Sequence, residues 1–138
     1  MYERVLVAID HSGIAERVLG AARELALLSH GEVWVVHVRE REVMGRGTVF
    51  DRETVDEAQQ AVDAAVGELA GAGIKAHGEI RHTIYGYAAR EIVDSATEHN
   101  AGVIVMGSRG RGDLAGILLG STAHKAIHLA DRPVLVVR

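Results

Sequence analysis

The sequence predicts a doubly wound, Rossmann-like α/β fold, in which a five-stranded parallel sheet carries helices on both faces. Short, almost unbroken apolar runs such as Val5–Ile9 and Val33–Val38 are typical of strands buried on both faces of a parallel sheet. Segments with apolar residues at helical spacing alternate with these runs. Glycines and polar residues lie between these segments, as expected for the turns that connect strands and helices.

The first forty residues predict one βαβ unit. Residues 5–9 form the first strand, and a helix runs from Ala15 to His30-Gly31, where we expect the glycine to end it. Residues 33–38 form the second strand. The charged segment 39–53 holds two glycines and shows no clear period, so we interpret it as a long loop. Its run Arg39-Glu40-Arg41-Glu42 is predicted to be a solvent-exposed face.

The rest of the chain predicts three more strands and three more helices. A helix over 55–69 is closed by Gly71-Ala72-Gly73, and the weaker, alternating strand 74–80 belongs at a sheet edge. A helix over 89–96, a strand over 103–106, a helix over 123–130 and a strand over 134–137 follow. We expect residues 1–138 to form a single domain.

Composition excludes several classes of protein. A net charge of −4 argues against a general nucleic-acid binder, which needs a basic face. Without cysteine the chain has no disulfide, thiol nucleophile or thiolate metal site. The N-terminus does not resemble a signal peptide, and no apolar stretch is long enough to span a membrane. We therefore expect a soluble cytoplasmic protein.

The stretch from Val103 to Thr122 carries the main functional signal. A strand leads into a glycine-rich turn, and Gly120-Ser121-Thr122 opens the next helix. Backbone N–H groups approach an anion closely where no Cβ intervenes, and a helix N-terminus adds partial positive charge. This stretch therefore predicts a binding site for a nucleotide triphosphate. Asp10, which ends the first strand at the same sheet edge, is expected to contact this ligand, to cap the following helix, or to do both.

Other site types fit less well. The Walker pattern fails because Asp113 stands where lysine is required, and the dinucleotide pattern Gly110-x-Gly112-x-x-Ala115 follows the wrong strand. His124 and His128 have the spacing of a zinc pair but lack a third ligand. His11 and His37 flank the crevice, and we interpret them as packing or polar-rim residues. No residue pair looks like an activated nucleophile and base, which favours binding over catalysis.

The pattern Gly107-x-x-Gly110, nine residues, then Gly120-Ser121 resembles the nucleotide-binding motif of the universal stress protein family. The stretches VLVAIDHS, VVHV, GYA and VMGSRGRG are similar to that family too, and the resemblance runs from Tyr2 to Arg138. The chain resembles the members that carry the motif and bind ATP.

This resemblance implies a set of nucleotide-binding residues. Asp10 faces the ribose or a phosphate-bound Mg²⁺ or Mn²⁺ ion, Val38 at the end of the second strand meets the adenine, and the glycine loop wraps ribose and phosphates. Ser121 and Thr122 offer hydroxyl groups to the β- and γ-phosphates. The full set implied is Ala8, Ile9, Asp10, Val38, Met106, Gly107, Ser108, Arg109, Gly110, Arg111, Gly112, Asp113, Gly120, Ser121, Thr122 and Ala123. The segment 39–53 does not align, and either Arg46 or Arg52 is a candidate to close over the phosphates.

The family's strand order, 3-2-1-4-5, leaves the last strand at an edge. Its residues Val134–Val137 are apolar and lack lysine, so we expect a homodimer through this strand. The leading hypothesis is an ATP-dependent regulatory switch read by an unknown signalling protein. A slow metal-dependent ATP hydrolase, a cyclic-AMP binder and a nucleotide-free dimeric scaffold remain as alternatives, and ADP or AMP are further candidate ligands.

Overall fold

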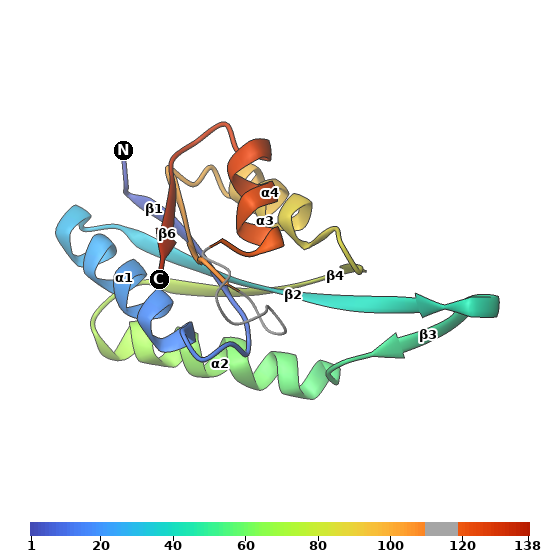
Figure 1. Ribbon diagram of the computed structural model, residues 1–138. Helices are drawn as coiled ribbons and strands as arrows, with labels where there is room; N and C mark the ends of the chain where they lie inside the picture. Colours follow the sequence, from blue (N-terminus) through green and yellow to red (C-terminus); the bar gives the residue numbers. More distant parts are fainter. Residues whose placement is uncertain (110–118) are drawn as a thin grey trace.

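In the computed structural model, which describes residues 1–109 and 119–138, a mostly parallel sheet lies between two layers of helices (Figure 1). A 3₁₀ turn, Gly45–Gly47, joins the second and third strands. The elements, in chain order, are β1 (Arg4–Ile9), α1 (Ala15–Ser29), β2 (Glu32–Met44), β3 (Thr48–Asp51), α2 (Val55–Gly71), β4 (Ala76–Ile84), α3 (Ala88–Glu98), β5 (Val103–Gly107), α4 (Ser121–Leu129) and β6 (Val134–Val137). None of these helices combines the length and apolar character needed to cross a bilayer.

The five predicted strands pair in the predicted order. β4, β2, β1, β5 and β6 lie side by side with every pair parallel, which is the order 3-2-1-4-5 of the prediction. β1 is central, since Val5 pairs with Val33 on β2 and with Val103 on β5. β4 pairs only with β2 among the described strands, so its predicted edge position is confirmed, although it starts and ends later than expected.

The sheet separates one helix layer, α1 and α2, from another, α3 and α4 (Figure 1). Alternate residues of the central strands pack against these two layers. Val5 and Val7 pack with α1 and α2, whereas Leu6 between them packs with α3 and α4. All three side chains are fully buried. The apolar runs therefore reflect burial on both faces, and the prediction of helices on both faces is confirmed.

The prediction of a loop over residues 39–53 was wrong. β2 continues to Met44 and forms a hairpin with the antiparallel strand β3, so the sheet has six strands, and this hairpin extends beyond the rest of the sheet (Figure 1). Arg41 pairs with Ile84 of β4 and with Asp51 of β3, which places these two strands on opposite sides of β2. Backbone pairing forms the hairpin with little apolar burial, which is why the segment lacks a strand's apolar pattern.

Arg39 also departs from the predicted solvent-exposed charge run. Its side chain is buried, with 4% of the residue exposed. Its Nε donates a hydrogen bond of 3.1 Å to the carbonyl of Glu53, and its guanidinium group lies 3.0 Å from a carboxylate oxygen of Asp51. Arg41 is exposed, as predicted. The hairpin therefore closes over Arg39 and compensates its charge.

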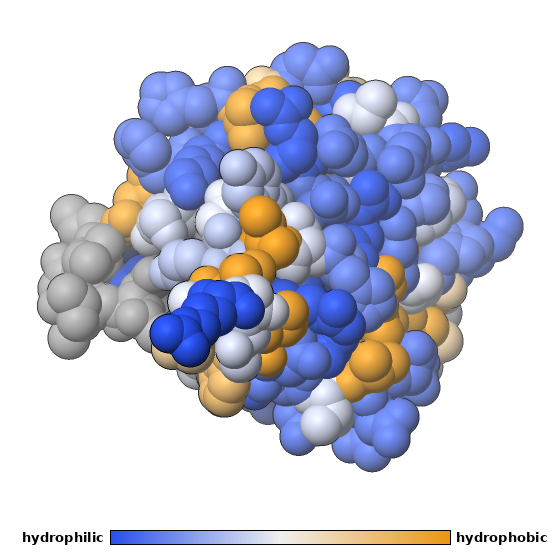
Figure 2. All heavy atoms as spheres, turned by 90° about the vertical axis from the view of Figure 1, so that its right-hand side faces the viewer, coloured by the Kyte–Doolittle hydropathy of each residue, from blue (hydrophilic) through white to orange (hydrophobic). Residues whose placement is uncertain are grey.

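The end of the molecule toward which the hairpin points carries exposed apolar residues in separate patches among polar side chains (Figure 2). Exposed apolar residues on the hairpin and at the end of β4 are Val43, Met44, Val49, Phe50, Ile84 and Tyr85. The patches do not merge into one continuous apolar face in this view.

The end of α1 differs from the predicted glycine stop. His30, and not Gly31, adopts the left-handed conformation that ends the helix, with a φ of 53°. Gly31 instead lets two backbone segments lie close together, because a Cβ there would lie 2.8 Å from the carbonyl oxygens of Tyr2 and Glu3. Those oxygens belong to the backbone that leads into β1, so they cannot move without shifting the strand.

We predict that Gly31→Ala lowers the free energy of unfolding by about 1–3 kcal/mol, since the added methyl group forces backbone to shift. The matched control is Gly20→Ala, inside α1, where an added Cβ meets no atom within 4 Å. That change should raise stability by roughly 0.5–1 kcal/mol because alanine favours a helix. Urea unfolding measures both free energies of unfolding, and changes of the same sign in the two variants would show that Gly31 is not needed for the close approach of the backbone.

Candidate functional site

A crevice lies where β1 and β5 end and where β2 passes beside them. The chain leaves β1 toward β2 on one side and leaves β5 toward β6 on the other, so the connections diverge at this point. In doubly wound sheets such a reversal of strand order leaves room for a ligand beyond the carboxyl ends of the strands. Two neighbouring cavities occupy this position, and both are lined by Asp10, Val38, Glu40 and Thr122.

The first cavity is mainly apolar. Val36 of β2 and Ile92 of α3 face it together with alanines of several elements. The structure brings many of the predicted site residues together here: Ala8, Ile9, Asp10, Val38, Met106, Gly107, Arg109, Thr122 and Ala123. Val38 lies within the long strand β2, which corrects its predicted position at a strand end.

The N-terminus of α4 opens toward these cavities. Gly120 is the N-cap residue, and no side chain of the described residues accepts a hydrogen bond from the first turn in the capping position. Ser121 and Thr122 line the second cavity, and Thr122 and Ala123 line the first. The free N–H groups of a helix start attract anions, and here two hydroxyl groups accompany them.

Two predicted residues have a structural role beside the cavities. The N–H of Ser108 donates to the carbonyl of Val137 at 2.7 Å, and the N–H of Gly120 donates to the carbonyl of Ser108 at 2.5 Å. Ser108 is buried and neither residue lines a cavity. The first bond holds Ser108, on one flank of the glycine-rich stretch, against β6, and the second holds Gly120, on the other flank, against Ser108. The predicted ligands Gly110, Arg111, Gly112 and Asp113 lie outside the described residues.

Asp10 points into the crevice and does not cap α1. One carboxylate oxygen accepts a hydrogen bond of 2.9 Å from the N–H of Ser12, whereas the N-cap position of α1 belongs to Ile14. The alternative of a helix cap is therefore wrong. Because Asp10 lines both cavities, its carboxylate is available to a ligand or to a ligand's metal ion.

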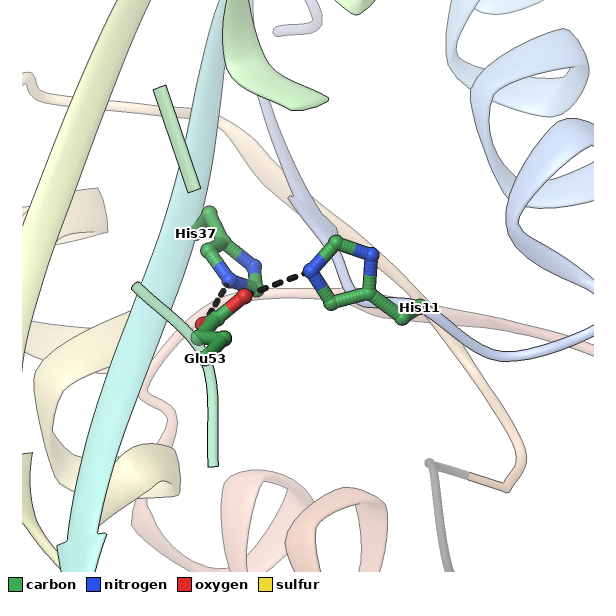
Figure 3. A group of neighbouring side chains, drawn as sticks. All are labelled: His11, His37 and Glu53. Atoms are coloured by element: carbon green, nitrogen blue, oxygen red, sulfur yellow. Dashed lines mark hydrogen bonds and ion pairs between the residues drawn. The ribbon is translucent and has the colours of Figure 1, made fainter. Parts of the chain in front are cut away.

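Three residues that the sequence did not connect converge on the wall of the second cavity (Figure 3). Both Nε2 atoms, of His11 and of His37, lie 2.5 Å from carboxylate oxygens of Glu53. His37 is 4% exposed and Glu53 is 9% exposed, so His37 has the packing role that was one of its two expected roles, whereas its contact with Glu53 was not predicted. Burial raises the pKa of the Glu53 carboxyl, but hydrogen bonds from His37 and His11 outweigh it and hold this pKa below its ordinary value.

The second cavity also carries positive charge. Lys125 of α4 donates to the carbonyl of Gly86 at 3.2 Å, and Arg52 lies with its guanidinium carbon 5.4 Å from the ring centre of Tyr85. All four residues line this cavity. Of the two arginines considered for closing over phosphates, Arg52 lines it, whereas Arg46 lies in the exposed turn of the hairpin. Lys125, Tyr85 and Gly86 were not among the predicted site residues, because none of them belongs to the glycine motif or to the end of a predicted strand.

His124 and His128 form an exposed pair on α4, with ring centres 4.6 Å apart. Among the described residues no third potential ligand joins them in a cluster.

Comparison with known proteins agrees with this geometry. The family model described as "Universal stress protein family" matches residues 1–138. The universal stress protein YxiE of Bacillus subtilis is 32% identical, with 100% of both chains covered. The universal stress protein MJ0577 of Methanocaldococcus jannaschii is 30% identical over 100% of this chain and 96% of its own.

Solved structures give the same result. The structure of MJ0577 superposes with a TM-score of 0.83 at 29% identity, covering 99% of this chain and 96% of that one. The universal stress protein from Archaeoglobus fulgidus, solved in complex with dAMP, superposes with a TM-score of 0.73 at 31% identity, covering 99% and 98%. The chain therefore belongs to the universal stress protein family.

Proposed function

We propose that this protein binds an adenine nucleotide, with ATP as its ligand, and acts as a nucleotide-dependent regulatory switch. The observation that carries the proposal is the continuity between the apolar cavity and the uncapped N-terminus of α4. An apolar pocket suits a nucleobase, and a helix start with two hydroxyl groups suits phosphates. The related protein from Archaeoglobus fulgidus was solved in complex with dAMP, which supports an adenine nucleotide as the class of ligand.

In the proposed complex the adenine lies between Val38 and the apolar side chains of the first cavity, and the ribose lies near Asp10. The phosphates lie against the first turn of α4, where Ser121, Thr122 and Ala123 offer N–H groups. Met106, Gly107, Ser108 and Arg109 lead into the glycine-rich stretch, and Gly110 through Asp113 complete it.

A regulatory role follows from what borders the phosphate end of the crevice. Arg52 and Glu53, which connect β3 to α2, line the second cavity beside Ser121 and Thr122. A bound triphosphate therefore contacts the base of the exposed hairpin, and its presence changes the surface offered to a signalling protein. Turnover of many ATP molecules per chain in the presence of Mg²⁺ would instead favour the hydrolase.

We predict that Thr122→Glu weakens ATP binding about tenfold or more, because the new carboxylate faces the phosphates. An acidic residue in the first turn of a helix favours the helix itself, so folding should be preserved. Thr48→Glu on the exposed strand β3, outside both cavities, is the matched control. Calorimetric titration with ATP measures both, and equal affinity in the two variants would remove α4 from the binding site.

Asp10→Asn tests the proposed Mg²⁺ or Mn²⁺ contact. Asparagine keeps an oxygen that accepts from Ser12 but loses the charge that a divalent ion prefers. We expect the affinity for ATP to fall about tenfold when Mg²⁺ is present and to change much less when it is absent. Titrations in MgCl₂ and in EDTA give the comparison. An equal fall in both would mean that Asp10 contacts the nucleotide without a metal ion.

The dimer forms in this proposal through β6. The carbonyls of Pro133 and Val137 accept hydrogen bonds from the N–H groups of Ile104 and Ser108. In a parallel pair, alternate residues of β6 therefore direct their backbone groups toward β5, and the residues between them direct theirs away from it. The N–H groups of Val134 and Val136 consequently face the open edge of the sheet. Antiparallel pairing with a second copy would use these groups and bury an apolar edge.

We predict that Val136→Pro converts the dimer to a monomer, because it removes an edge N–H while leaving the pairing of β6 with β5 intact. Val136→Thr, which keeps the N–H and the branched shape, should remain dimeric. Light scattering after size-exclusion chromatography measures the mass relative to the 14.8 kDa chain. A proline variant that stays dimeric would place the interface elsewhere.

A further inference from the structure

His11, His37 and Glu53 reach one point from three separate segments (Figure 3). His11 follows β1, His37 lies on β2, and Glu53 lies between β3 and α2. One ligand-type atom from each residue lies within 4.8 Å of the other two. Two of the side chains are buried, and the His11 side chain is 33% exposed beside the second cavity.

The hydrogen bonds of His37 determine which of its nitrogen atoms carries a proton. Its Nδ1 lies 2.8 Å from the carbonyl oxygen of Ile9, which only accepts, so Nδ1 must donate. A cation between Nε2 and Glu53 would replace the proton of their hydrogen bond and bind the lone pair of Nε2. A histidine that donates Nδ1–H to a backbone carbonyl and presents Nε2 to a cation is the arrangement by which proteins orient metal ligands.

Glu53 is also held in place by its surroundings. Arg39 donates from Nε to the Glu53 carbonyl at 3.1 Å, and the next residue, Thr54, is the N-cap of α2 and accepts from the N–H of Glu57. Among the described residues only the two histidines pair with the Glu53 carboxylate, and no lysine or arginine compensates its charge. A cation between the three side chains would be bound by a negative carboxylate and two neutral imidazoles.

We propose that His11, His37 and Glu53 bind a divalent first-row transition metal ion, with Zn²⁺ as the probe. Two imidazoles and one carboxylate are a common protein ligand set for such ions, and the fourth position here faces the second cavity. With metal–ligand distances of about 2.0–2.2 Å, tetrahedral ligands lie roughly 3.3 Å apart, so the three side chains need only small shifts to surround an ion.

A second group of potential ligands, Glu79, Glu98 and His99, does not support the same proposal. Arg81 lies among them, with its Nη1 2.8 Å from Glu79 and 2.9 Å from Glu98. This guanidinium group already occupies the position of a cation. Among the described residues no such guanidinium group pairs with the carboxylate of Glu53, so a metal ion is proposed at Glu53 and not at Glu79.

The proposed ion differs from a metal ion carried by the nucleotide. Mg²⁺ prefers oxygen ligands and keeps several waters, whereas imidazole nitrogen suits Zn²⁺, Ni²⁺ or Cu²⁺. Asp10 is not one of the three ligands. The site can therefore be tested without nucleotide, and its failure would leave the proposed ATP site unaffected.

The experiment is a calorimetric titration with ZnCl₂ of the full chain, from which metal and nucleotide have first been removed with EDTA and dialysis. We expect one tight site per chain, and we expect His11→Ala and Glu53→Gln each to weaken it tenfold or more. Millimolar Mg²⁺ should not compete. Because an ion that links three segments binds only the folded chain, zinc should also raise the urea midpoint of the wild type and not of these variants.

His124→Ala is the control, because it removes the other histidine pair while leaving the cluster intact. Zinc affinity should be unchanged in that variant. His11→Ala alters a partly exposed side chain, so it reports on the site even if Glu53→Gln folds poorly. Unchanged zinc affinity in His11→Ala, or loss of tight binding in His124→Ala, would overturn the proposal.

Discussion

The parallel pairing of β1 with β2 on one side and β5 on the other determines most of this structure. Val5, Leu6 and Val7 are fully buried because both strand edges and both faces of β1 are covered. The connections leaving β1 and β5 run in opposite directions across the sheet, so no helix or strand of the described residues covers the carboxyl ends of these strands. The crevice therefore follows from the strand order, and the residues that end each strand become its lining.

The parts of the fold that bury apolar surface were predictable from sequence, and the parts held by polar contacts were not. Unbroken apolar runs identified the core strands because both faces of the sheet are covered. The hairpin of β2 and β3 is held by backbone pairing and by ion pairs such as Arg39 with Asp51. These contacts join residues far apart in the chain, so the segment looks like a charged loop when only neighbouring residues are considered.

The same difference separates the two groups of site residues. Asp10 and Thr122 were predicted because they directly follow a strand or open a helix. His11, His37 and Glu53 meet only because the hairpin brings Glu53 back over β2, and their spacing matches no metal-ligand motif. Gly107 shows a further ambiguity, since a Cβ there would lie 2.8 Å from Cδ1 of Ile14. The end of the Ile14 side chain can shift, but a Cβ would also lie 3.2 Å from the carbonyl oxygen of Arg109. Packing therefore also favours a glycine at this position, so its presence in a motif does not by itself identify a ligand contact.

The two proposed ligands are linked by the cavity that they would share. Glu53 and His37 line it on one side, and Thr122 and Lys125 at the start of α4 line it on another. An ion held by the histidines would add positive charge facing the same space as the phosphates. Attraction between the two favours both, and coupling of this kind is reciprocal, so each ligand would strengthen binding of the other. Because Glu53 lies in the connection from the hairpin to α2, the hairpin would be the element through which either ligand changes the surface of the protein.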